Sequence, residues 1–277
     1  MTLNIVKVGG GIVEKEESLN QLLNDFSLLQ GPKILVHGGG RLATTLATQM
    51  GIETKMVEGR RVTDTEMLRI VTMVYGGLVN KQVVAQLQAR GVNALGLTGA
   101  DCNVMRSHRR PPIMIKEQNL VPDSTERVGK NVFEIDYGFV GDVDQCDGEI
   151  LTTLLRQGIT PVLAPLTHDG QGQMLNTNAD TIASEAAKAL AAHFDVTLTF
   201  CFEKKGVLRD ANDDTSVIPH ITASDFTQLV NDGIVEGGMI PKLQNALNAC
   251  RAGVKRVVIT HADQLRQTDC GTVVTYQ

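Results

Sequence analysis

The sequence predicts an α/β fold with helices on both faces of a mainly parallel sheet. Short apolar, β-branched segments alternate along the 277 residues with longer segments of helical spacing. Several of the short segments are apolar almost throughout, as expected for strands that are covered on both faces. We expect strands at residues 3–8, 33–37, 94–98, 161–166, 196–200 and 256–260.

The helices are predicted from apolar residues that recur three or four positions apart. We expect them at residues 19–29, 42–50, 150–155 and 181–194. From Met67 to Leu87 the pattern is longer and contains Gly76-Gly77, which indicates either two helices or one kinked helix. Residues 113–143 contain short strand-like pieces interrupted by glycines and by Pro122, and we expect β-hairpins there.

The composition narrows the class of protein. A hydrophobic content of 42% with charges of both signs is typical of a globular protein that buries a core. The net charge of −5 argues against nucleic acid or an acidic membrane surface as the main partner. The five scattered cysteines indicate reduced thiols, and no apolar segment reaches the length of a membrane span. We therefore expect a cytoplasmic protein.

Two glycine-rich loops follow the first two predicted strands. Gly9-Gly10-Gly11 ends the first strand, and Gly38-Gly39-Gly40 lies between the second strand and a helix. Glycine lets the backbone approach a ligand closely, and a helix start adds free N–H groups, so both loops suit an anion. Because the carboxyl ends of parallel strands share one edge, we expect a single anion-binding crevice there.

The second loop also fits another kind of site. Gly38-x-Gly40-x-x-Ala43 matches a dinucleotide-binding fingerprint, which requires an acidic residue at the end of a strand roughly twenty residues on. Glu58 lies near that position, but residues 54–58 do not have the pattern of a buried strand. A dehydrogenase is therefore the weaker interpretation, and no GxxxxGK[ST] phosphate loop occurs in the sequence.

Charged and polar side chains accompany these loops. Lys7 lies inside the first strand, where a lysine is costly unless it is paired, used, or at an edge that reaches solvent. Asn176-Thr177-Asn178-Ala179-Asp180 precedes a helix and has more polar groups than a helix cap requires. Lys242 falls in the first turn of another helix, where a cation opposes the helix dipole, so a bound anion is expected.

Two adjacent arginines follow the second glycine loop along the chain. Gly59-Arg60-Arg61-Val62-Thr63 precedes a helix that we expect to start near Asp64. A guanidinium group can bind a carboxylate with two hydrogen bonds. A solvated surface position is an equally good explanation for at least one of the two arginines.

These segments together resemble the ordered motifs of the acetylglutamate kinases, a branch of the amino acid kinase family. The matching segments are Lys7-Val8-Gly9-Gly10, Val36-His37-Gly38-Gly39-Gly40, Gly59 to Thr63, Asn176 to Asp180, and Gly238-Met239-Ile240-Pro241-Lys242. The resemblance implies the amino acid kinase fold, a three-layer αβα sandwich around a mainly parallel central sheet. It also implies an acylglutamate-binding N-terminal lobe with inserted β-hairpins, residues 1–192, and an ATP-binding C-terminal lobe, residues 193–277.

The resemblance also implies a role for each matching residue. Lys7 and Lys242 would stabilise the transferring phosphoryl group, and Asp180 would orient both lysines. The residues implied in substrate binding are Gly39, Gly40, Arg61, Asn176 and Asn178. Those implied in ATP binding are Gly9 and Gly10 in the first glycine loop and, in the C-terminal lobe, Glu203, Gly206, Leu208 and Glu236, within the segments 203–208 and 234–236.

The implied reaction is ATP-dependent phosphorylation of the side-chain carboxylate of N-acetyl-L-glutamate, which gives an acyl phosphate in arginine biosynthesis. A carboxylate with a pKa of about 4.3 is already ionised at neutral pH, so the reaction needs no general base. Phosphoryl transfer mainly requires alignment and stabilisation of charge on the transferred oxygens. The implied cofactors are ATP and Mg²⁺, with Mg²⁺ held by phosphates and water and not by protein ligands.

The sequence departs from the family pattern in two places. The usual Ser/Thr-Asp-Val before the nucleotide-loop glycine is replaced by Phe202-Glu203-Lys204, so Glu203 stands in for the aspartate. Residues 98–103 and the following Arg106, Arg109 and Arg110 are also atypical. We hypothesise that these arginines lie near the acyl pocket and favour a longer acidic acyl group such as succinyl; arginines on a solvent-exposed loop are the alternative.

Three further expectations rest on the resemblance. The chain starts a few residues before its first strand, without the N-terminal helix of arginine-inhibited hexameric members, which predicts an arginine-insensitive homodimer. Kinases of the same fold that act on aspartate, glutamate, carbamate or a nucleotide monophosphate are the nearest alternatives. A non-catalytic amino-acid sensor is a third, and the presence of both Lys7 and Lys242 argues against it.

Overall fold

The computed structural model describes residues 1–57, 59–116, 132–210, 212–237, 239–267 and 270–276. Within these residues the central sheet has eight strands in the order β14-β16-β15-β13-β1-β2-β10-β5. Their bounds are His220–Ile221, Thr272–Val274, Arg256–His261, Asp195–Phe202, Thr2–Val8, Lys33–His37, Thr160–Leu163 and Ala94–Leu97. Neighbouring strands are parallel except β15 and β16, so the predicted, mainly parallel sheet is confirmed. The expectations for Glu58, Pro122 and Gly238 lie outside the described residues.

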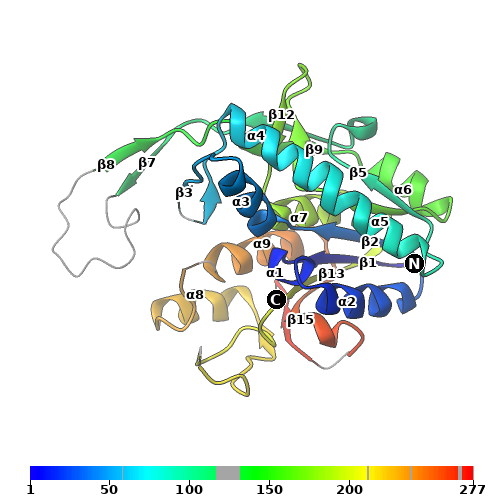
Figure 1. Ribbon diagram of the computed structural model, residues 1–277. Helices are drawn as coiled ribbons and strands as arrows, with labels where there is room; N and C mark the ends of the chain where they lie inside the picture. Colours follow the sequence, from blue (N-terminus) through cyan, green and yellow to red (C-terminus); the bar gives the residue numbers. More distant parts are fainter. Residues whose placement is uncertain (58, 117–131, 211, 238, 268–269, 277) are drawn as a thin grey trace.

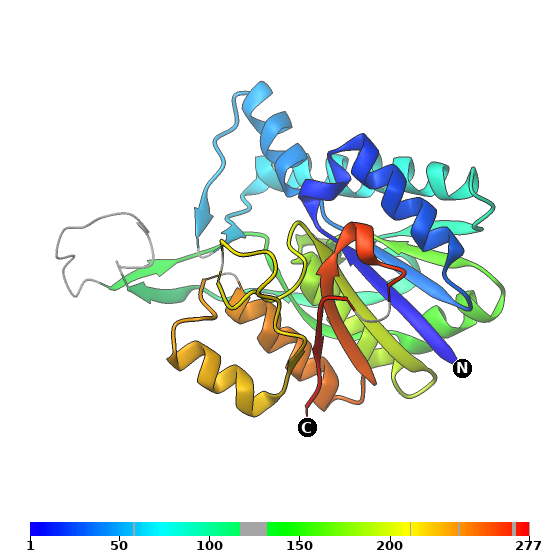
Figure 2. The same cartoon turned by 90° about the horizontal axis from the view of Figure 1, so that it is seen from below.

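Helices cover both faces of this sheet, as Figures 1 and 2 show. On one face lie α1 (Gly10–Val13), α2 (Glu16–Leu28), α3 (Gly40–Gln49), α4 (Thr65–Val71), η1 (Thr72–Val79) and α5 (Asn80–Gln88). On the other lie α6 (Gly148–Arg156), α7 (Ala179–Leu190), α8 (Ala223–Asn231) and α9 (Met239–Arg251). Side chains alternate along each strand, so in β1 Leu3 and Ile5 enter one core and Val6 and Val8 the other. The three-layer prediction is confirmed.

The predicted strand at 161–166 is wrong at its end. It stops at Leu163, and Leu166 begins β11 (Leu166–His168) of a second sheet. Pro165 lies between them and has no N–H to donate to a strand ladder, which explains the break. The second sheet has the order β12-β11-β6-β9, with β12 at Met174–Asn176, β6 at Met105–Arg109 and β9 at Gly141–Cys146.

The β-hairpins expected within residues 113–143 are confirmed in the described part of that segment. β7 (Ile113–Lys116) pairs antiparallel with β8 (Val132–Ile135), and this pair projects from the body of the molecule in Figure 1. A short antiparallel pair, β3 (Met56–Val57) and β4 (Arg60–Arg61), lies nearer the sheet. The remaining short elements are η2 (Asp101–Asn103) and η4 (Ala262–Gln264).

The long helical pattern after Met67 is one run of three consecutive elements, α4, η1 and α5. Its middle, Thr72–Val79, is π-helical and contains Gly76-Gly77, where the sequence indicated a kink or a break. Asp64 caps α4 by accepting a hydrogen bond from Met67 N, as the expected helix start requires. π-Helical segments often occur at functional sites, and this one places Tyr75 beside the second glycine loop.

Candidate active site

The site begins where β1, β2 and β13 end, at one edge of the sheet. Gly38 N donates a hydrogen bond to Val8 O at 3.0 Å, and Gly9 N donates one to Cys201 O at 3.1 Å, so the strand pairing continues into both loops. A Cβ atom added to Gly38 would lie 2.9 Å from Gly10 N. The two glycine loops are therefore in backbone contact, an approach that only glycine permits at this position.

A lysine–aspartate–lysine cluster lies next to these loops. Asp180 is in the first turn of α7, and its Oδ1 is 2.7 Å from Lys7 Nζ while its Oδ2 is 3.7 Å from Lys242 Nζ. The exposed fractions of the three side chains are 11% for Lys7, 17% for Asp180 and 16% for Lys242. Lys7 shares its strand face with Leu3 and Ile5, the face covered by α7 and α9, and this explains how the three residues meet.

The charges in this cluster are coupled. Burial would raise the pKa of Asp180, but the attraction first of Lys7 and then of Lys242 outweighs it and holds the pKa below its usual range. Burial lowers the pKa of Lys242, and Asp180 opposes that shift. One carboxylate thus balances two ammonium groups, and the cluster keeps a net positive charge for an anion.

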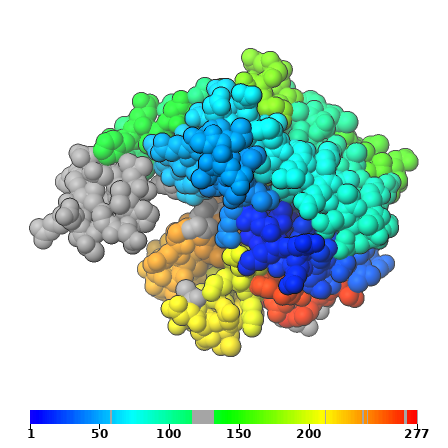
Figure 3. Space-filling model, in the orientation of Figure 1, coloured from blue at the N-terminus to red at the C-terminus, as the bar shows by residue number. Residues whose placement is uncertain are grey.

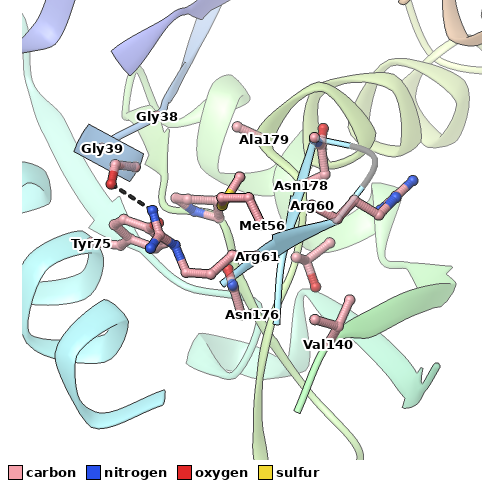
Figure 4. Close-up of a pocket in the computed structure, with 14 residues that line it drawn as sticks. Gly38, Gly39, Met56, Arg60, Arg61, Tyr75, Val140, Asn176, Asn178 and Ala179 are labelled. Carbon is pink, nitrogen blue, oxygen red and sulfur yellow. Dashed lines mark hydrogen bonds between the residues drawn. The ribbon is translucent and has the colours of Figure 1, made fainter. Parts of the chain in front are cut away.

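A small cavity of about 190 Å³ opens beside the second glycine loop, and Figure 4 shows its walls. We call it the acceptor cavity. Its lining comes from residues 38–40, the β3–β4 pair, η1 and the segment before α7. The lining residues are Gly38, Gly39, Gly40, Met56, Gly59, Arg60, Arg61, Tyr75, Val140, Pro165, Asn176, Thr177, Asn178 and Ala179.

Arg61 connects the cavity wall to the glycine loop. Its Nη2 donates hydrogen bonds to Gly40 O and Thr44 Oγ1, both at 2.8 Å, and its side chain is buried. In Figure 4 Arg61 reaches toward the loop, whereas Arg60 points the other way. The buried Tyr75 packs so closely that a Cβ on Gly39 would lie 3.0 Å from its ring, and burial raises the pKa of its phenol while Arg61 lowers it.

The Asn-Thr-Asn-Ala-Asp segment forms the opposite wall. Asn176 Nδ2 donates to Thr63 Oγ1 at 2.9 Å, and Asn176 is buried. Asn178 is the N-cap of α7, and its Oδ1 accepts hydrogen bonds from the N–H groups of Asp180 and Thr181. The capping interpretation therefore holds for Asn178, while Asn176 and Asp180 have other partners.

The sequence did not single out a buried network below the glycine loop. His37 Nδ1 lies 2.8 Å from Gly38 O, and His37 Nε2 lies 3.1 Å from Asn80 Nδ2, which also donates to Val162 O. Burial lowers the pKa of His37 to about 4, so the ring is neutral at neutral pH. The ring then donates from Nδ1 and accepts at Nε2, and it fixes the loop in position.

A second, larger hollow of about 540 Å³ is lined by residues from the segments 204–210 and 233–236 and by Met239. We call it the nucleotide-side groove; in Figure 3 the segments that line it belong to the yellow and orange surface below the N-terminal segments. Its lining residues are Lys204, Gly206, Val207, Leu208, Arg209, Asp210, Gly233, Ile234, Glu236 and Met239. Gly206, Leu208 and Glu236, which the resemblance implies in ATP binding, thus line one hollow. Glu203 turns instead to Arg41, at 3.7 Å, and Gly9 and Gly10 belong to the glycine crevice.

Comparison with known proteins agrees with this geometry. The sequence profile of the amino acid kinase family matches residues 2–261. The chain is 63% identical over 265 residues to an acetylglutamate kinase of Parabacteroides distasonis and 61% identical over 267 residues to one of Bacteroides thetaiotaomicron, with 96% of each chain covered in both cases. A solved structure, smu.665 from Streptococcus mutans UA159, aligns with a TM-score of 0.75 at 27% identity and covers 99% of both chains.

The chain belongs to the acetylglutamate kinases of the amino acid kinase family. Relatives of this identity that cover nearly the whole chain decide the family, and the αβα sandwich and the large parallel sheet agree with it. None of the helices in the described residues is long and apolar enough to cross a lipid bilayer.

One expectation for this acetylglutamate kinase is wrong. In the described part of the chain, none of Arg106, Arg109 and Arg110 lines the acceptor cavity. Arg109 pairs with Asp136 at 2.9 Å, Arg110 pairs with Asp142, and Arg106 donates a hydrogen bond to Gln145. Arg109 and Arg110 thus have acidic partners on neighbouring segments, and Arg106 has an amide partner across the β6–β9 pair.

Proposed function

We propose that this kinase transfers the γ-phosphoryl group of ATP to the side-chain carboxylate of N-acetyl-L-glutamate, giving an acyl phosphate in arginine biosynthesis. The observation that carries the proposal is the Lys7–Asp180–Lys242 cluster beside the glycine loops. Asp180 directly follows Ala179 of the acceptor cavity, and Lys242 lies on the same helix as Met239 of the nucleotide-side groove. The cluster joins an acceptor site to a donor site.

The residue chemistry suits this transfer. The acceptor carboxylate is ionised at neutral pH, so it attacks without a general base. His37, which directly precedes the second glycine loop, is fully buried and both its ring nitrogens have partners, so it is not free to act as a general base. Lys7 and Lys242 stabilise the charge on the transferred oxygens, Asp180 aligns both ammonium groups, and the loop N–H groups bind the anion.

The acceptor and the nucleotide would use different walls. Gly39, Gly40, Arg61, Asn176 and Asn178 would hold the acylated glutamate, since all of them line the acceptor cavity. The nucleotide would lie along Gly206, Leu208 and Glu236, with its phosphates directed toward Gly9 and Gly10 at the crevice and Glu203 at the rim.

We propose that Mg²⁺ enters with ATP and is held by phosphate oxygens and water. In the described residues no group of three or more His, Cys, Asp or Glu side chains is arranged to hold a metal ion. The carboxylate nearest the transfer position, Asp180, is already engaged by two lysines. When bound, Mg²⁺ would neutralise charge on the phosphates.

We propose a lobe boundary at residues 192 and 193. In the described sheet, β5, β10, β2 and β1 come from residues before this point, and β13, β15, β16 and β14 come from residues after it. The boundary thus falls between β1 and β13, whose carboxyl ends carry a glycine loop and the nucleotide-side segment. This division supports an acylglutamate-binding lobe of residues 1–192 and an ATP-binding lobe of residues 193–277.

We also propose a cytoplasmic homodimer. Support for a dimer comes from exposed apolar side chains, Met73 and Leu78 on η1 and Leu95 on the edge strand β5. Support for the cytoplasm comes from the cysteines, which are free thiols in the described structure. Light scattering of the purified protein tests the dimer, and a monomeric mass would contradict it.

N-succinyl-L-glutamate is a second candidate acceptor, favoured by one observation. Two arginines, Arg60 and Arg61, line the acceptor cavity, and their positive charge is opposite in sign to the additional carboxylate of a succinyl group. The relatives' names favour acetyl. The ratio of kcat/KM for the two acceptors decides between them.

A coupled ADP-release assay with a panel of acylated glutamates tests the function. We expect ATP consumption that requires N-acetyl-L-glutamate or its succinyl analogue, and an acyl phosphate that hydroxylamine traps. ADP release that is independent of the acceptor, or faster with aspartate, glutamate or carbamate, would overturn the proposal.

A further inference from the structure

Lys242 has an aromatic neighbour in addition to its carboxylate. Its ammonium group lies over the ring of Phe202, 4.7 Å from the ring centroid, and 3.7 Å from Asp180 Oδ2. Asp180 is 1 Å closer to Lys7, at 2.7 Å, so the shared carboxylate favours the other lysine. The contacts of the two lysines therefore differ in kind.

The strand pattern places Phe202 at this point. Along β13, Val196, Leu198 and Phe200 are fully buried in the core below α7 and α9. Phe202 is the last residue of the strand on that same face, and it is only partly buried. Its ring thus stands between the core and the reacting edge of the sheet, next to the first turn of α9.

We propose that Phe202 is a positioning residue that holds the Lys242 ammonium group through a cation–π contact. This inference rests on the proposed phosphoryl transfer. A ring face attracts the cation without accepting a conventional hydrogen bond, so the N–H donors of Lys242 stay available for phosphoryl oxygens. A carboxylate or a hydroxyl group at the same place would occupy at least one of them.

The position of Lys242 explains why such a contact is needed. A cation in the first turn of a helix is repelled by the helix dipole, and it is drawn away from the site unless something holds it. The charged groups around it are Asp180, which attracts it, and Lys7, which repels it. The ring of Phe202 adds attraction from a third side and excludes water from the ammonium group.

Kinetics of three variants test the proposal. We expect Phe202→Leu, which keeps apolar bulk but loses the ring, to lower kcat by about 3- to 30-fold with both KM values little changed. Phe202→Tyr keeps the ring face and should retain kcat within about 2-fold. The matched control is Phe194→Leu, which removes a buried ring from the same core at the other end of the sheet and should leave kcat unchanged.

A graded replacement separates the ring face from simple packing. Mono-, di- and trifluorophenylalanine at position 202 keep nearly the same shape but progressively weaken the ring face. We expect log kcat to fall with each fluorine. A flat series, or an equal loss of kcat in Phe202→Leu and Phe194→Leu, would overturn the proposal.

A second readout does not depend on turnover. Isotope-labelled lysine side chains followed by NMR report the titration of Lys242, and loss of the ring face in Phe202→Leu should lower the pKa of Lys242 further. An unchanged titration would overturn the contact itself. If the wild-type protein does not phosphorylate N-acetyl-L-glutamate, the proposed function fails, and this titration still decides whether Phe202 holds the cation.

Discussion

The acceptor cavity and the nucleotide-side groove differ in the burial and hydrogen bonding of the side chains that line them. In the wall of the acceptor cavity, Arg61 and Asn176 are buried and hydrogen-bonded, Arg61 to Gly40 and Asn176 to Thr63. The nucleotide-side groove is nearly three times larger and has exposed residues such as Lys204, Arg209 and Glu236 in its wall. The acceptor side is thus organised before the substrate arrives.

This difference predicts which substitutions should cost the most free energy. Removing one partner from a buried polar pair leaves the other unsatisfied, which costs about 1–3 kcal/mol and more for a charged group. Substituting a partly exposed side chain in a wide groove costs less, because water replaces the lost contact. Changes in the lysine cluster should have the largest effect on catalysis.

The largest effect is expected for Lys7→Met, in the lysine cluster. Lys7 should act on charge that develops during transfer, so kcat should fall on the order of 100- to 1000-fold while both KM values change little. Steady-state ADP release measures this. The matched control is Lys33→Met, a buried strand lysine at the opposite edge of the sheet, whose Nζ donates to Ser27 O and Leu29 O. A similar loss of kcat in both variants would mean that a buried strand lysine only supports the fold.

The sequence was sufficient to predict features that depend on residues close together in the chain. Apolar strands, glycine loops at their ends and a polar helix start lie in short segments, and parallel pairing brings those segments to one edge. The meeting of Lys7, Asp180 and Lys242 follows from this rule, although the three residues are far apart in the chain.

Features that depend on long-range pairing were missed or wrong. The hydrogen bond between His37 and Asn80 joins residues that are 43 positions apart in the sequence. Asn80 directly follows the π-helical segment η1, and no sequence pattern indicated that this segment is π-helical. Arg109 and Arg110 were placed near the acyl pocket because they follow an atypical loop. Their partners, Asp136 and Asp142, lie 27 and 32 positions away, and only the strand pairing brings them together.

The buried network on the acceptor side should also appear in the pH dependence of stability. The pKa of His37 is about 4 in the folded chain, against 6.5 for an ordinary histidine. Between these values the unfolded chain binds the proton and the folded chain does not, so stability falls as pH drops from 6.5 toward 4. The loss reaches about 3 kcal/mol.

A His37→Gln variant isolates that contribution. We expect the difference in unfolding free energy between wild type and variant to shrink as pH falls from 6.5 to 4, because glutamine does not titrate. Urea unfolding at several pH values measures it, and the difference above pH 7.5 serves as the reference. A difference that is constant with pH would show that His37 is not held neutral below the glycine loop.

A conservative substitution of Arg61 tests whether the acceptor cavity affects the binding of N-acetyl-L-glutamate without affecting the binding of ATP. Arg61→Lys cannot keep both hydrogen bonds of Nη2 in the same geometry, so the KM for N-acetyl-L-glutamate should rise about 10- to 100-fold. The KM for ATP should stay within about 2-fold. The control is Arg41→Lys. Arg41 is exposed and lies in the first turn of α3, next to Gly40, which accepts a hydrogen bond from Arg61. Equal increases in both KM values would break the distinction between the two hollows.

The smallest effect is expected on the nucleotide side. Leu208→Ala removes part of the apolar wall of the groove but creates no buried unsatisfied group, so the KM for ATP should rise only about 3- to 10-fold. The KM for N-acetyl-L-glutamate and kcat should hardly change, since the cluster and the acceptor cavity keep their contacts. Leu28→Ala, an exposed leucine at the end of α2, controls for the loss of an apolar side chain elsewhere. If Leu208→Ala instead lowers kcat as strongly as Lys7→Met, the groove wall takes part in aligning the phosphates, and the nucleotide side is as strictly organised as the acceptor side.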